Sequence, residues 1–459
     1  MALKKINMKK YWTITCLALI LTACGEGSTE TKDESTAIIS NVKHPEWSKD
    51  AVIYEANIRQ HTQEGTFNAF AQDIPRLKTM GIDIIWLMPI HPIGEKNKKG
   101  TLGSYYAVKD YKAVNAEFGT ENDFRNLVKT AHDNGIKVLI DWVANHTAWD
   151  NVWTETNPEF YTKDEAGNFM PPVADWEDVI DLNYDNQELR TAMLEALKYW
   201  VAEFDIDGYR CDVAGMVPTD FWDNARKELD AIKPVFMLAE GEETELHMDA
   251  FDMTYSWELM HLMRKVASGE ETPQAIKDMY TRDFQRYPKG YYKMNIITNH
   301  DENSWNGTAD EFFGPSQEAW FVFAATTYGM PLVYSGQEAN NKKRIEFFEK
   351  DPIDWSGGYT FNQLYQTLFS IKEANPALWN GDFGGSLEWI ETTANDKVLA
   401  YKRVKEDHLV IVLINLTDER VEFEIDRDYL AMQRVFGGGV FTVSKNQLIG
   451  PYRYKVFIK

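Results

Sequence analysis

Cysteine is scarce in this chain of 459 residues, which contains only Cys16, Cys24 and Cys211. Cys16 lies in an apolar stretch near the N-terminus that is predicted to be cleaved off as part of a signal peptide. Two cysteines then remain in the rest of the chain. If Cys24 is lipidated, as argued below, Cys211 has no partner. The sequence therefore predicts a fold without an internal disulfide.

Positive charge is also in short supply. The chain has 48 Lys and Arg against 71 Asp and Glu, for a formal net charge of -23. Residues 1–23 carry four lysines and no acidic residue, so the remainder is more acidic still. Such a surface argues against nucleic acid or an anionic membrane as a partner. It leaves a neutral ligand open.

A hydrophobic run long enough to cross a bilayer is missing as well, because the apolar run from Ile14 to Leu21 is too short to span comfortably. Residues 1–23 combine a basic start with this run and predict a secretory signal peptide. The segment L-T-A-C resembles the lipobox of bacterial lipoproteins, so we expect an exported, membrane-anchored protein, acylated at Cys24. A signal peptide cut nearby or a transmembrane anchor are the alternatives. Residues 24–43 are polar and predict a flexible tether.

From Trp47 onward, strand and helix patterns alternate. Strands are predicted at 51–56, 82–89 and 136–141, with helices at 67–80 and 124–134 between or after them. Further strands are expected near Gly208, Val235, Phe251, Asn295 and Pro331, which makes eight. The repeated βα order predicts an α/β fold, a (β/α)8 TIM barrel over residues 44–378. Functional groups are then expected at the C-terminal ends of its strands.

Two regions depart from this alternation. Residues 142–186 are rich in Trp, Pro, Asn and Asp, and so long an excursion after the third strand predicts a functional insertion. Residues 379–459 contain short runs of alternating apolar and polar residues. They predict a separate C-terminal antiparallel β-sandwich domain.

Charged residues stand where several predicted strands end. Arg210 and Asp212 share one face of their strand, because residues two apart point the same way. Such a pair by itself is more often a structural ion pair than a functional one. However, Glu240, Asp301 and Asp141 also follow apolar runs that predict strands. We therefore expect these side chains to converge at the mouth of the barrel.

Five segments in order carry a resemblance to a known family: D-W-V-A-N-H (141–146), D-L-N (181–183), G-Y-R-C-D (208–212), A-E-G-E (239–242) and N-H-D (299–301). With these, the chain resembles the α-amylase superfamily, glycoside hydrolase family 13. The resemblance implies that Asp212 is the catalytic nucleophile, Glu240 the general acid/base and Asp301 a third catalytic carboxylate that grips sugar hydroxyls. It also implies that His146, His300, Asp141 and Arg210 contact substrate, and that Tyr106 stacks on the sugar ring.

The two catalytic carboxyls need different protonation states, because one must attack and the other must donate a proton. Arg210 beside Asp212 is expected to keep that carboxyl ionised. Glu240, at the end of an apolar strand, is expected to have the raised pKa.

The sequence departs from the family pattern in two places. Gly215 and Met216 stand where many amylases carry Lys and His, and Glu242 replaces an aromatic residue. Asn145 matches a calcium ligand of the family, and Asp175 or Asp178 in the insertion could supply further oxygen ligands. We therefore expect a structural calcium ion. Some branches of the family keep this Asn and bind no ion there.

Together these features predict a retaining glycoside hydrolase that cleaves α-1,4-glucosidic bonds in starch and maltodextrins. D-L-N and Val213 leave an oligo-1,6-glucosidase or a neopullulanase- or cyclomaltodextrinase-like enzyme open. A transglycosylase is a further alternative, because a sugar hydroxyl can replace water in the second step. An inactive glycan-binding barrel is the alternative outside enzymes. Oligomeric state is not predicted.

Overall fold

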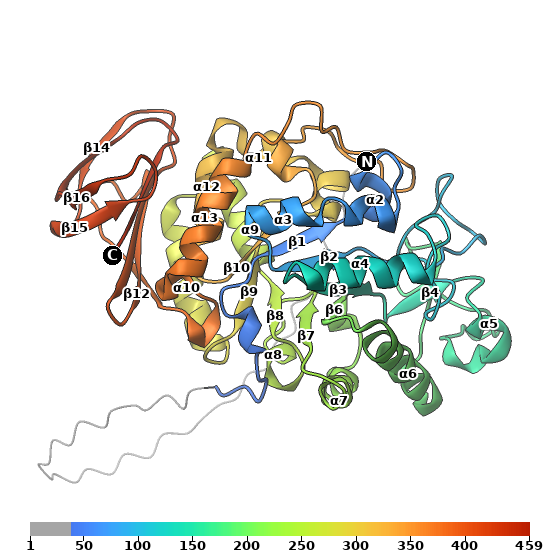
Figure 1. Ribbon diagram of the computed structural model, residues 1–459. Helices are drawn as coiled ribbons and strands as arrows, with labels where there is room; N and C mark the ends of the chain where they lie inside the picture. The colour runs from blue at the N-terminus through green and yellow to red at the C-terminus, as the bar shows by residue number, and fades with distance from the viewer. Residues whose placement is uncertain (1–37) are drawn as a thin grey trace, which may run out of the picture. The chain divides into compact units, whose positions relative to one another are not determined.

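The computed structural model describes residues 38–459, which form one compact unit built on a closed barrel of eight parallel strands (Figure 1). The predicted α/β barrel is therefore confirmed. The strands follow the order β1-β10-β9-β8-β7-β6-β3-β2 around the barrel. They are β1 (Ile53–Ala56), β2 (Ile84–Leu87), β3 (Lys137–Trp142), β6 (Gly208–Cys211), β7 (Phe236–Ala239), β8 (Met253–Tyr255), β9 (Tyr292–Asn295) and β10 (Met330–Tyr334).

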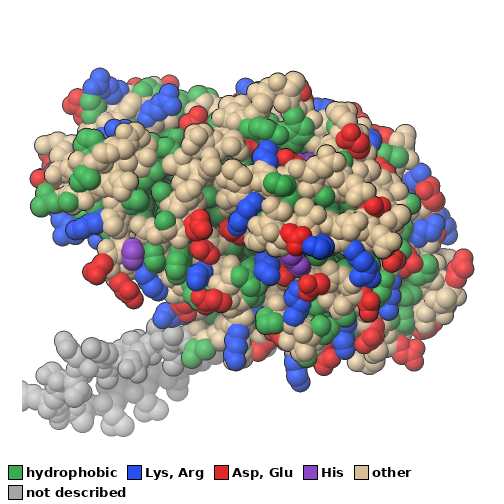
Figure 2. Space-filling view, viewed as in Figure 1, with side chains coloured by type: hydrophobic (Ala, Val, Ile, Leu, Met, Phe, Trp, Pro, Cys, Tyr) green, Lys and Arg blue, Asp and Glu red, His purple; other side chains and the backbone are tan. Residues whose placement is uncertain are grey.

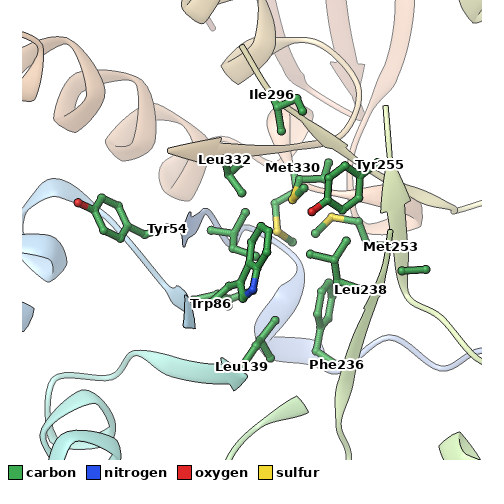
Figure 3. Close-up of a cluster of buried hydrophobic side chains, with 14 of the residues drawn as sticks. Tyr54, Trp86, Leu139, Phe236, Leu238, Met253, Tyr255, Ile296, Met330 and Leu332 are labelled. Atoms are coloured by element: carbon green, nitrogen blue, oxygen red, sulfur yellow. The ribbon is translucent and has the colours of Figure 1, made fainter. Parts of the chain in front are cut away.

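Large apolar side chains fill the interior of the barrel, as Figure 3 shows for Trp86, Leu139, Phe236, Leu238 and Met330. The strands are buried along their whole length apart from Lys137 at the start of β3. Parallel strands covered on both faces read as nearly continuous apolar runs, which is why they were predictable from the sequence. The interior is a packed core, so a ligand must bind at its end.

Helices surround the barrel in Figure 1. The helix predicted at 67–80 is divided into α2 (Phe67–Ala71) and α3 (Ile74–Met80), because Pro75 begins a new first turn. The helix predicted at 124–134 is present as α4 (Glu121–Asp133), and α6 (Gln187–Phe204) follows the insertion. The remaining helices are α1 (Ile58–His61), α5 (Trp153–Thr156), α7 (Thr219–Asp230), α8 (Leu246–Asp249), α9 (Trp257–Ser268), α10 (Pro273–Arg286), α11 (Ala309–Phe313), α12 (Gln317–Thr326) and α13 (Asn362–Ala374).

The insertion after β3 has little regular structure. It contains α5 and a small antiparallel sheet of β4 (His146–Ala148) and β5 (Val179–Asp181). The pairing places His146 opposite Asp181. The predicted insertion therefore folds back on itself, and its two ends pair in this small sheet after β3.

The C-terminal strands form a six-stranded antiparallel sheet and a two-stranded one. The larger sheet has the order β11 (Ser386–Trp389), β12 (Val398–Lys405), β13 (His408–Asn415), β18 (Tyr454–Ile458), β15 (Tyr429–Arg434) and β16 (Val440–Val443). The smaller one pairs β14 (Val421–Glu424) with β17 (Asn446–Ile449). Along β12, Ala400 packs toward the smaller sheet, whereas Tyr401 packs into the core shared with the barrel. Tyr401 also shares a 2.6 Å hydrogen bond with Thr326 of α12.

The predicted signal peptide (1–23), the acylated Cys24 and most of the tether (24–43) lie outside the described residues and stay predictions. Within residues 38–459, no helix has both the length and the apolar character to cross a membrane. On the face viewed in Figure 2, basic side chains are interspersed with acidic ones.

Candidate active site

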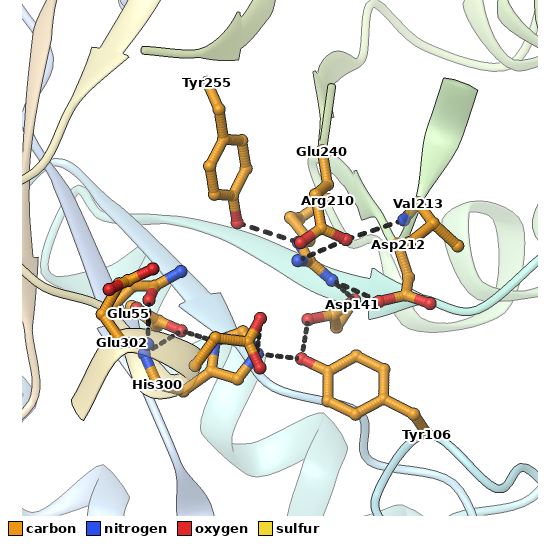
Figure 4. A network of polar contacts seen from close by, with 12 residues as sticks. Glu55, Tyr106, Asp141, Arg210, Asp212, Val213, Glu240, Tyr255, His300 and Glu302 are labelled. Atoms are coloured by element: carbon orange, nitrogen blue, oxygen red, sulfur yellow. Dashed lines mark hydrogen bonds and ion pairs between the residues drawn. The ribbon is translucent and has the colours of Figure 1, made fainter. Parts of the chain in front are cut away.

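The predicted site residues meet at the C-terminal ends of neighbouring strands (Figure 4). Asp141 of β3 is aligned with Arg210 of β6, and Cys211 of β6 is aligned with Ala239 of β7. Asp212 and Glu240 follow these last two residues directly. Their backbones are held by hydrogen bonds to the preceding strand, from Asp212 N to Trp142 O and from Glu240 N to Cys211 O, both 2.9 Å. Strand register therefore places the side chains together.

Arg210 is the centre of the site and is fully buried. Its Nη1 donates to Asp141 Oδ1 at 2.9 Å and to Asp212 Oδ1 at 3.0 Å, and its Nε donates to Tyr255 Oη at 3.1 Å. Its Nη2 lies 3.0 Å from Glu240 Oε2, an ion pair without hydrogen-bond alignment. One guanidinium thus contacts three carboxyl groups.

Glu240 also contacts the residue that follows Asp212. The backbone N–H of Val213 donates to Glu240 Oε2 at 2.7 Å. Val213 adopts φ +37°, a left-handed conformation that is strained for a β-branched residue. Strained residues of this kind cluster at functional sites. This strained conformation directs the N–H of Val213 toward Glu240 Oε2 and so holds Glu240 beside Asp212.

Burial is the largest influence on the pKa values of two of these carboxyls, Asp212 and Asp141. Burial raises the pKa of Asp212 well above its ordinary value, Glu240 adds to this shift, and Arg210 opposes it. Burial also raises the pKa of Asp141 to about 6, against the effect of Arg210. Arg210 lowers the pKa of Asp212, in the predicted direction, but burial and Glu240 outweigh it, because one cation is divided among three carboxyls. The Arg210–Glu240 contact was not anticipated.

His300 is held by a further buried carboxylate, Glu55. Its Nδ1 contacts Glu55 of β1, and its Nε2 lies 2.8 Å from Tyr106 Oη and 3.3 Å from Asp301 Oδ2. Burial disfavours the imidazolium, but Asp301 and Glu55 outweigh this and raise the pKa of His300 to about 9. His300 is thus protonated at neutral pH.

Tyr106 links this group to the first one. Its hydroxyl donates to Asp141 Oδ2 at 3.1 Å, and its ring stacks on that of His300 with centroids 5.6 Å apart. Asp301 keeps 37% of its side chain exposed, so it remains free to accept from a ligand. His146 is buried, and burial lowers its pKa to about 4, so its ring is neutral. Its Nε2 lies 4.0 Å from Asp212 Oδ2.

The residues predicted for calcium do not form a site that fits the ion. Asp178 Oδ1 lies 2.9 Å from Lys99 Nζ, which also donates to the backbone oxygen of Asp175 at 3.2 Å. Asn145 is buried beside His146, with 3.2 Å between Nδ2 and Nδ1. Nowhere in residues 38–459 do three or more His, Cys, Asp or Glu side chains form a group that could hold a metal. The Lys99 ammonium group therefore pairs with the Asp178 carboxylate that would have to bind calcium.

A cavity of about 300 Å³ opens at this end of the barrel and reaches the catalytic candidates. Its size is at the lower end of the range for small-molecule sites. The lining combines polar groups with aromatic rings, as a sugar site requires. It is lined by Lys99, Ser104, Tyr106, His146, Trp176, Asp178, Val179, Asp212, Val213, Glu240, His300, Asp301, Trp305, Phe347 and Phe348.

Several residues of this site were not predicted from the sequence. Glu55 carried a usable signal, because it is an acid near the end of the apolar run A-V-I-Y-E-A, like Glu240 at the end of its own strand. Lys99, Trp305 and Phe347 carried none. Lys99 and Phe347 lie outside the helices and strands, and Trp305 lies on a π-helical turn, so only the tertiary structure brings them to the cavity.

The chain is similar to known proteins over most of its length. The family model described as "Alpha amylase, catalytic domain" matches residues 52–172 and 173–397. The α-amylase MalA of Haloarcula japonica is 27% identical over 420 residues, which cover 88% of this chain and 61% of that protein. The chain thus spans less than two thirds of the length of that relative.

Two solved structures are similar over nearly their whole length. A maltogenic α-amylase, AmyB from Thermotoga neapolitana, is 32% identical with a TM-score of 0.82, covering 90% of this chain and 99% of its own. An α-amylase from Lactobacillus plantarum is 30% identical with a TM-score of 0.81 and the same coverage. The similarity includes the barrel and extends into the C-terminal strands.

Proposed function

We propose a reaction for this chain, which belongs to the α-amylase family, glycoside hydrolase family 13: it hydrolyses α-1,4-glucosidic bonds in starch and maltodextrins with retention of configuration. The observation that carries the proposal is the contact of Arg210 with both Asp212 and Glu240 at the barrel mouth. The neighbouring strand ends and the Val213–Glu240 hydrogen bond favour a short separation of the carboxyls. Retaining enzymes need ~5–5.5 Å, whereas inverting enzymes need ~6.5–9.5 Å to admit a water.

In the proposed first step, Asp212 attacks the anomeric carbon and forms a β-linked glycosyl ester. Glu240 gives its proton to the departing glycosidic oxygen, so the leaving sugar departs neutral. In the second step Glu240 takes a proton from water, which attacks the same carbon and releases Asp212. The product recovers the α configuration.

The raised pKa of Asp212 fits this scheme if the two carboxyls share a proton. In the free site, burial and the neighbouring Glu240 favour the protonated form of Asp212, against the effect of Arg210. A bound glycosidic oxygen offers Glu240 an acceptor and draws the proton there, which leaves Asp212 ionised against Arg210. Substrate binding thus sets the protonation states that catalysis needs.

The other polar groups hold the sugar to be cleaved. We assign Asp301, His300 and His146 to its hydroxyls, and Tyr106 to its apolar face. Because His300 is protonated, it donates to an oxygen, whereas neutral His146 can donate or accept. Asp141 is saturated by Trp86, Tyr106 and Arg210, so its role is to hold Arg210 and Tyr106 in place.

The test is the anomeric form of the first product. Proton NMR during the first minutes of maltodextrin hydrolysis should show α-anomeric reducing ends before mutarotation mixes the signals. Asp212→Asn should lower kcat by at least about 10³-fold with the fold intact, because no other nucleophile replaces it. A β-anomer appearing first would show that the roles given to Asp212 and Glu240 are wrong.

Sizing the products from starch, pullulan and isomaltose separates the alternatives. Cleavage of pullulan or isomaltose in preference to starch would indicate an α-1,6-acting or neopullulanase-like enzyme. Products longer than the substrate would indicate a transglycosylase, because a sugar hydroxyl would then have replaced water. Binding of maltotriose without turnover would indicate the inactive glycan-binding barrel.

A further inference from the structure

Asp301 is followed by a rare backbone element that the proposed reaction has not used. A single π-helical turn, Glu302–Asn306, begins directly after it. Such turns are uncommon and occur frequently at functional sites. The carboxylate of Asp301 is paired with His300 at 3.3 Å and is otherwise partly exposed, so its own contacts hold it only weakly. Its position in the free site therefore depends on the backbone that carries it.

A buried ion pair fixes the first residue of this turn. Glu302 Oε2 accepts from Nη1 of Arg264, which lies on α9, and from Nδ2 of Asn306 at 3.1 Å. The backbone N–H of Glu302 donates to Asn299 Oδ1 at 2.8 Å. The side chains of Arg264 and Glu302 are only 13% and 8% exposed. The residue next to Asp301 is thus held through both its side chain and its backbone.

The Arg264 guanidinium has few partners for a buried cation. It lies 3.6 Å from the centre of the Phe312 ring on α11. Within residues 38–459, its Nε and Nη2 are buried and have no hydrogen-bond acceptor. Burial lowers the pKa of Arg264, and Glu302 opposes this shift. Because apolar residues in place of a buried ion pair are often as stable or more so, packing alone does not account for this pair.

The pair acts at a distance from the substrate. Neither Arg264 nor Glu302 lines the cavity that Asp301 reaches. On the other side of Asp301 in the chain, His300 is held by buried Glu55. Asp301 therefore lies between two neighbours that are each anchored by a buried charge. Any effect of Arg264 on the reaction must pass through the π-helical turn to Asp301.

We propose that Arg264 and Glu302 are positioning residues, which hold the π-helical turn so that the Asp301 carboxylate faces the hydroxyls of the sugar being cleaved. Displacing a group at the reaction centre by about 1 Å can lower the rate by about 10²-fold. A buried pair that fixes one backbone conformation prevents such a displacement. This inference rests on the proposed function, in which Asp301 holds the cleaved sugar.

A double-mutant cycle with Asp301 tests this role, because the losses of two residues that act through the same group do not add. On maltodextrin, Arg264→Met should lower kcat by about 10- to 100-fold, with KM within about threefold of native. In protein that already carries Asp301→Asn, the same substitution should change kcat by less than about twofold. A general loss of stability would instead lower kcat by the same factor in both backgrounds.

Two further variants separate the pair from other effects of substitution. Glu302→Gln keeps the size of the side chain but removes its charge, so it should lower kcat by about three- to tenfold. It replaces Arg264→Met in the cycle if that variant does not fold. Arg282→Met is the matched control, because Arg282 pairs with Glu258 of the same helix α9 but is 55% exposed. It should leave kcat within about twofold of native.

Equal losses in both backgrounds, or no loss in the native background, would overturn the proposal. If the native protein does not cleave maltodextrin, the proposed function fails, and calorimetric binding of maltotriose to the proteins of the cycle then decides about the pair. Binding that weakens by about tenfold in each single variant, and no further in the double variant, would retain it. Unchanged, additive or undetectable binding would reject it.

Discussion

At the scale of single residues, the site is governed by a shortage of positive charge. Arg210 serves three carboxyls, and a fourth, Glu55, is fully buried beneath His300. Glu55 does not line the cavity, so its effect must pass through the imidazole. It is a positioning residue that keeps His300 charged and turns Nε2–H toward Tyr106 and the substrate.

Glu55→Gln tests this role through the pH dependence of activity. His300 has its pKa raised to about 9, so the native enzyme keeps the imidazolium below that pH and loses it above. Removing the Glu55 charge lowers this pKa, because Asp301 is then the main group that opposes the effect of burial. The alkaline limb of kcat/KM on maltodextrin should move down by at least about one pH unit, with near-native activity at pH 5.

A purely structural role for Glu55 would instead lower kcat/KM by the same factor at every pH, and that result would contradict the assignment. No other titratable group facing His300 would produce the same shift of the alkaline limb. Burial raises the pKa of Tyr106, and that of Arg210 also lies well above its ordinary value, so neither titrates in this range. The effect of Asp301 is common to both proteins.

At the scale of elements, the pairing of β6 with β7 brings Asp212 beside Glu240. Gly208 begins β6 at φ +148°, aligned with Phe236 of β7. A Cβ at this position would lie 1.9 Å from the carbonyl oxygen of Phe236, inside the backbone of the neighbouring strand. A side chain here would force the two strands apart. The glycine therefore sets the close approach on which the catalytic geometry depends.

Gly208→Ala should lower the free energy of unfolding by more than about 3 kcal/mol, since the obstructing atoms are backbone and cannot rotate away. Urea denaturation followed by fluorescence would measure this. The matched control is Gly357→Ala, where the new Cβ meets nothing within 4 Å, and its effect should stay within about 0.5 kcal/mol. Similar stability of the two variants would show that β6 can shift without cost.

At the scale of the whole molecule, the C-terminal sheet is attached to the barrel by a buried cation. Arg403 of β12 is fully buried and donates to the carbonyl oxygens of Thr327, Trp379 and Gly385. Thr327 immediately follows α12, which precedes β10. Burial without a carboxylate partner lowers the pKa of Arg403 to about 10. The arginine thus joins the sheet to the last βα unit.

Arg403→Met should lower the free energy of unfolding by about 2–4 kcal/mol, because it leaves three buried carbonyls without their donor. Activity at 25 °C should remain within about twofold of native, since the catalytic strand ends belong to other elements. Thermal unfolding and starch hydrolysis would be measured together. Arg427→Met, at a side chain 66% exposed, is the control and should change neither. Activity lost in step with stability would show that the sheet also shapes the site.

Part of the site was predictable because strand ends leave a local signature. A buried parallel strand is a short apolar run, and a charged residue at its end stands out, as Asp141 and Glu240 do, whereas Asp301 lies beyond the end of β9. The barrel was predictable for the same reason. The division of the first helix at Pro75 and the strands β11, β15, β16 and β17 were not predicted. Edge strands and short hairpins carry weak patterns, because only one face is buried.

The sequence by itself determined which residue types stand at the strand ends, and through its motifs the family to which they belong. Only the tertiary structure decided how their charges interact. The pKa of Asp212 follows from burial and from the sharing of Arg210 with Asp141 and Glu240, contacts that join three strands. The tertiary structure also brings the aromatic rings of Tyr106, Trp305 and Phe347 into one cavity wall, although long stretches of chain separate them in the sequence. Electrostatic and stacking energies depend on distance in space, which spacing along a sequence does not give.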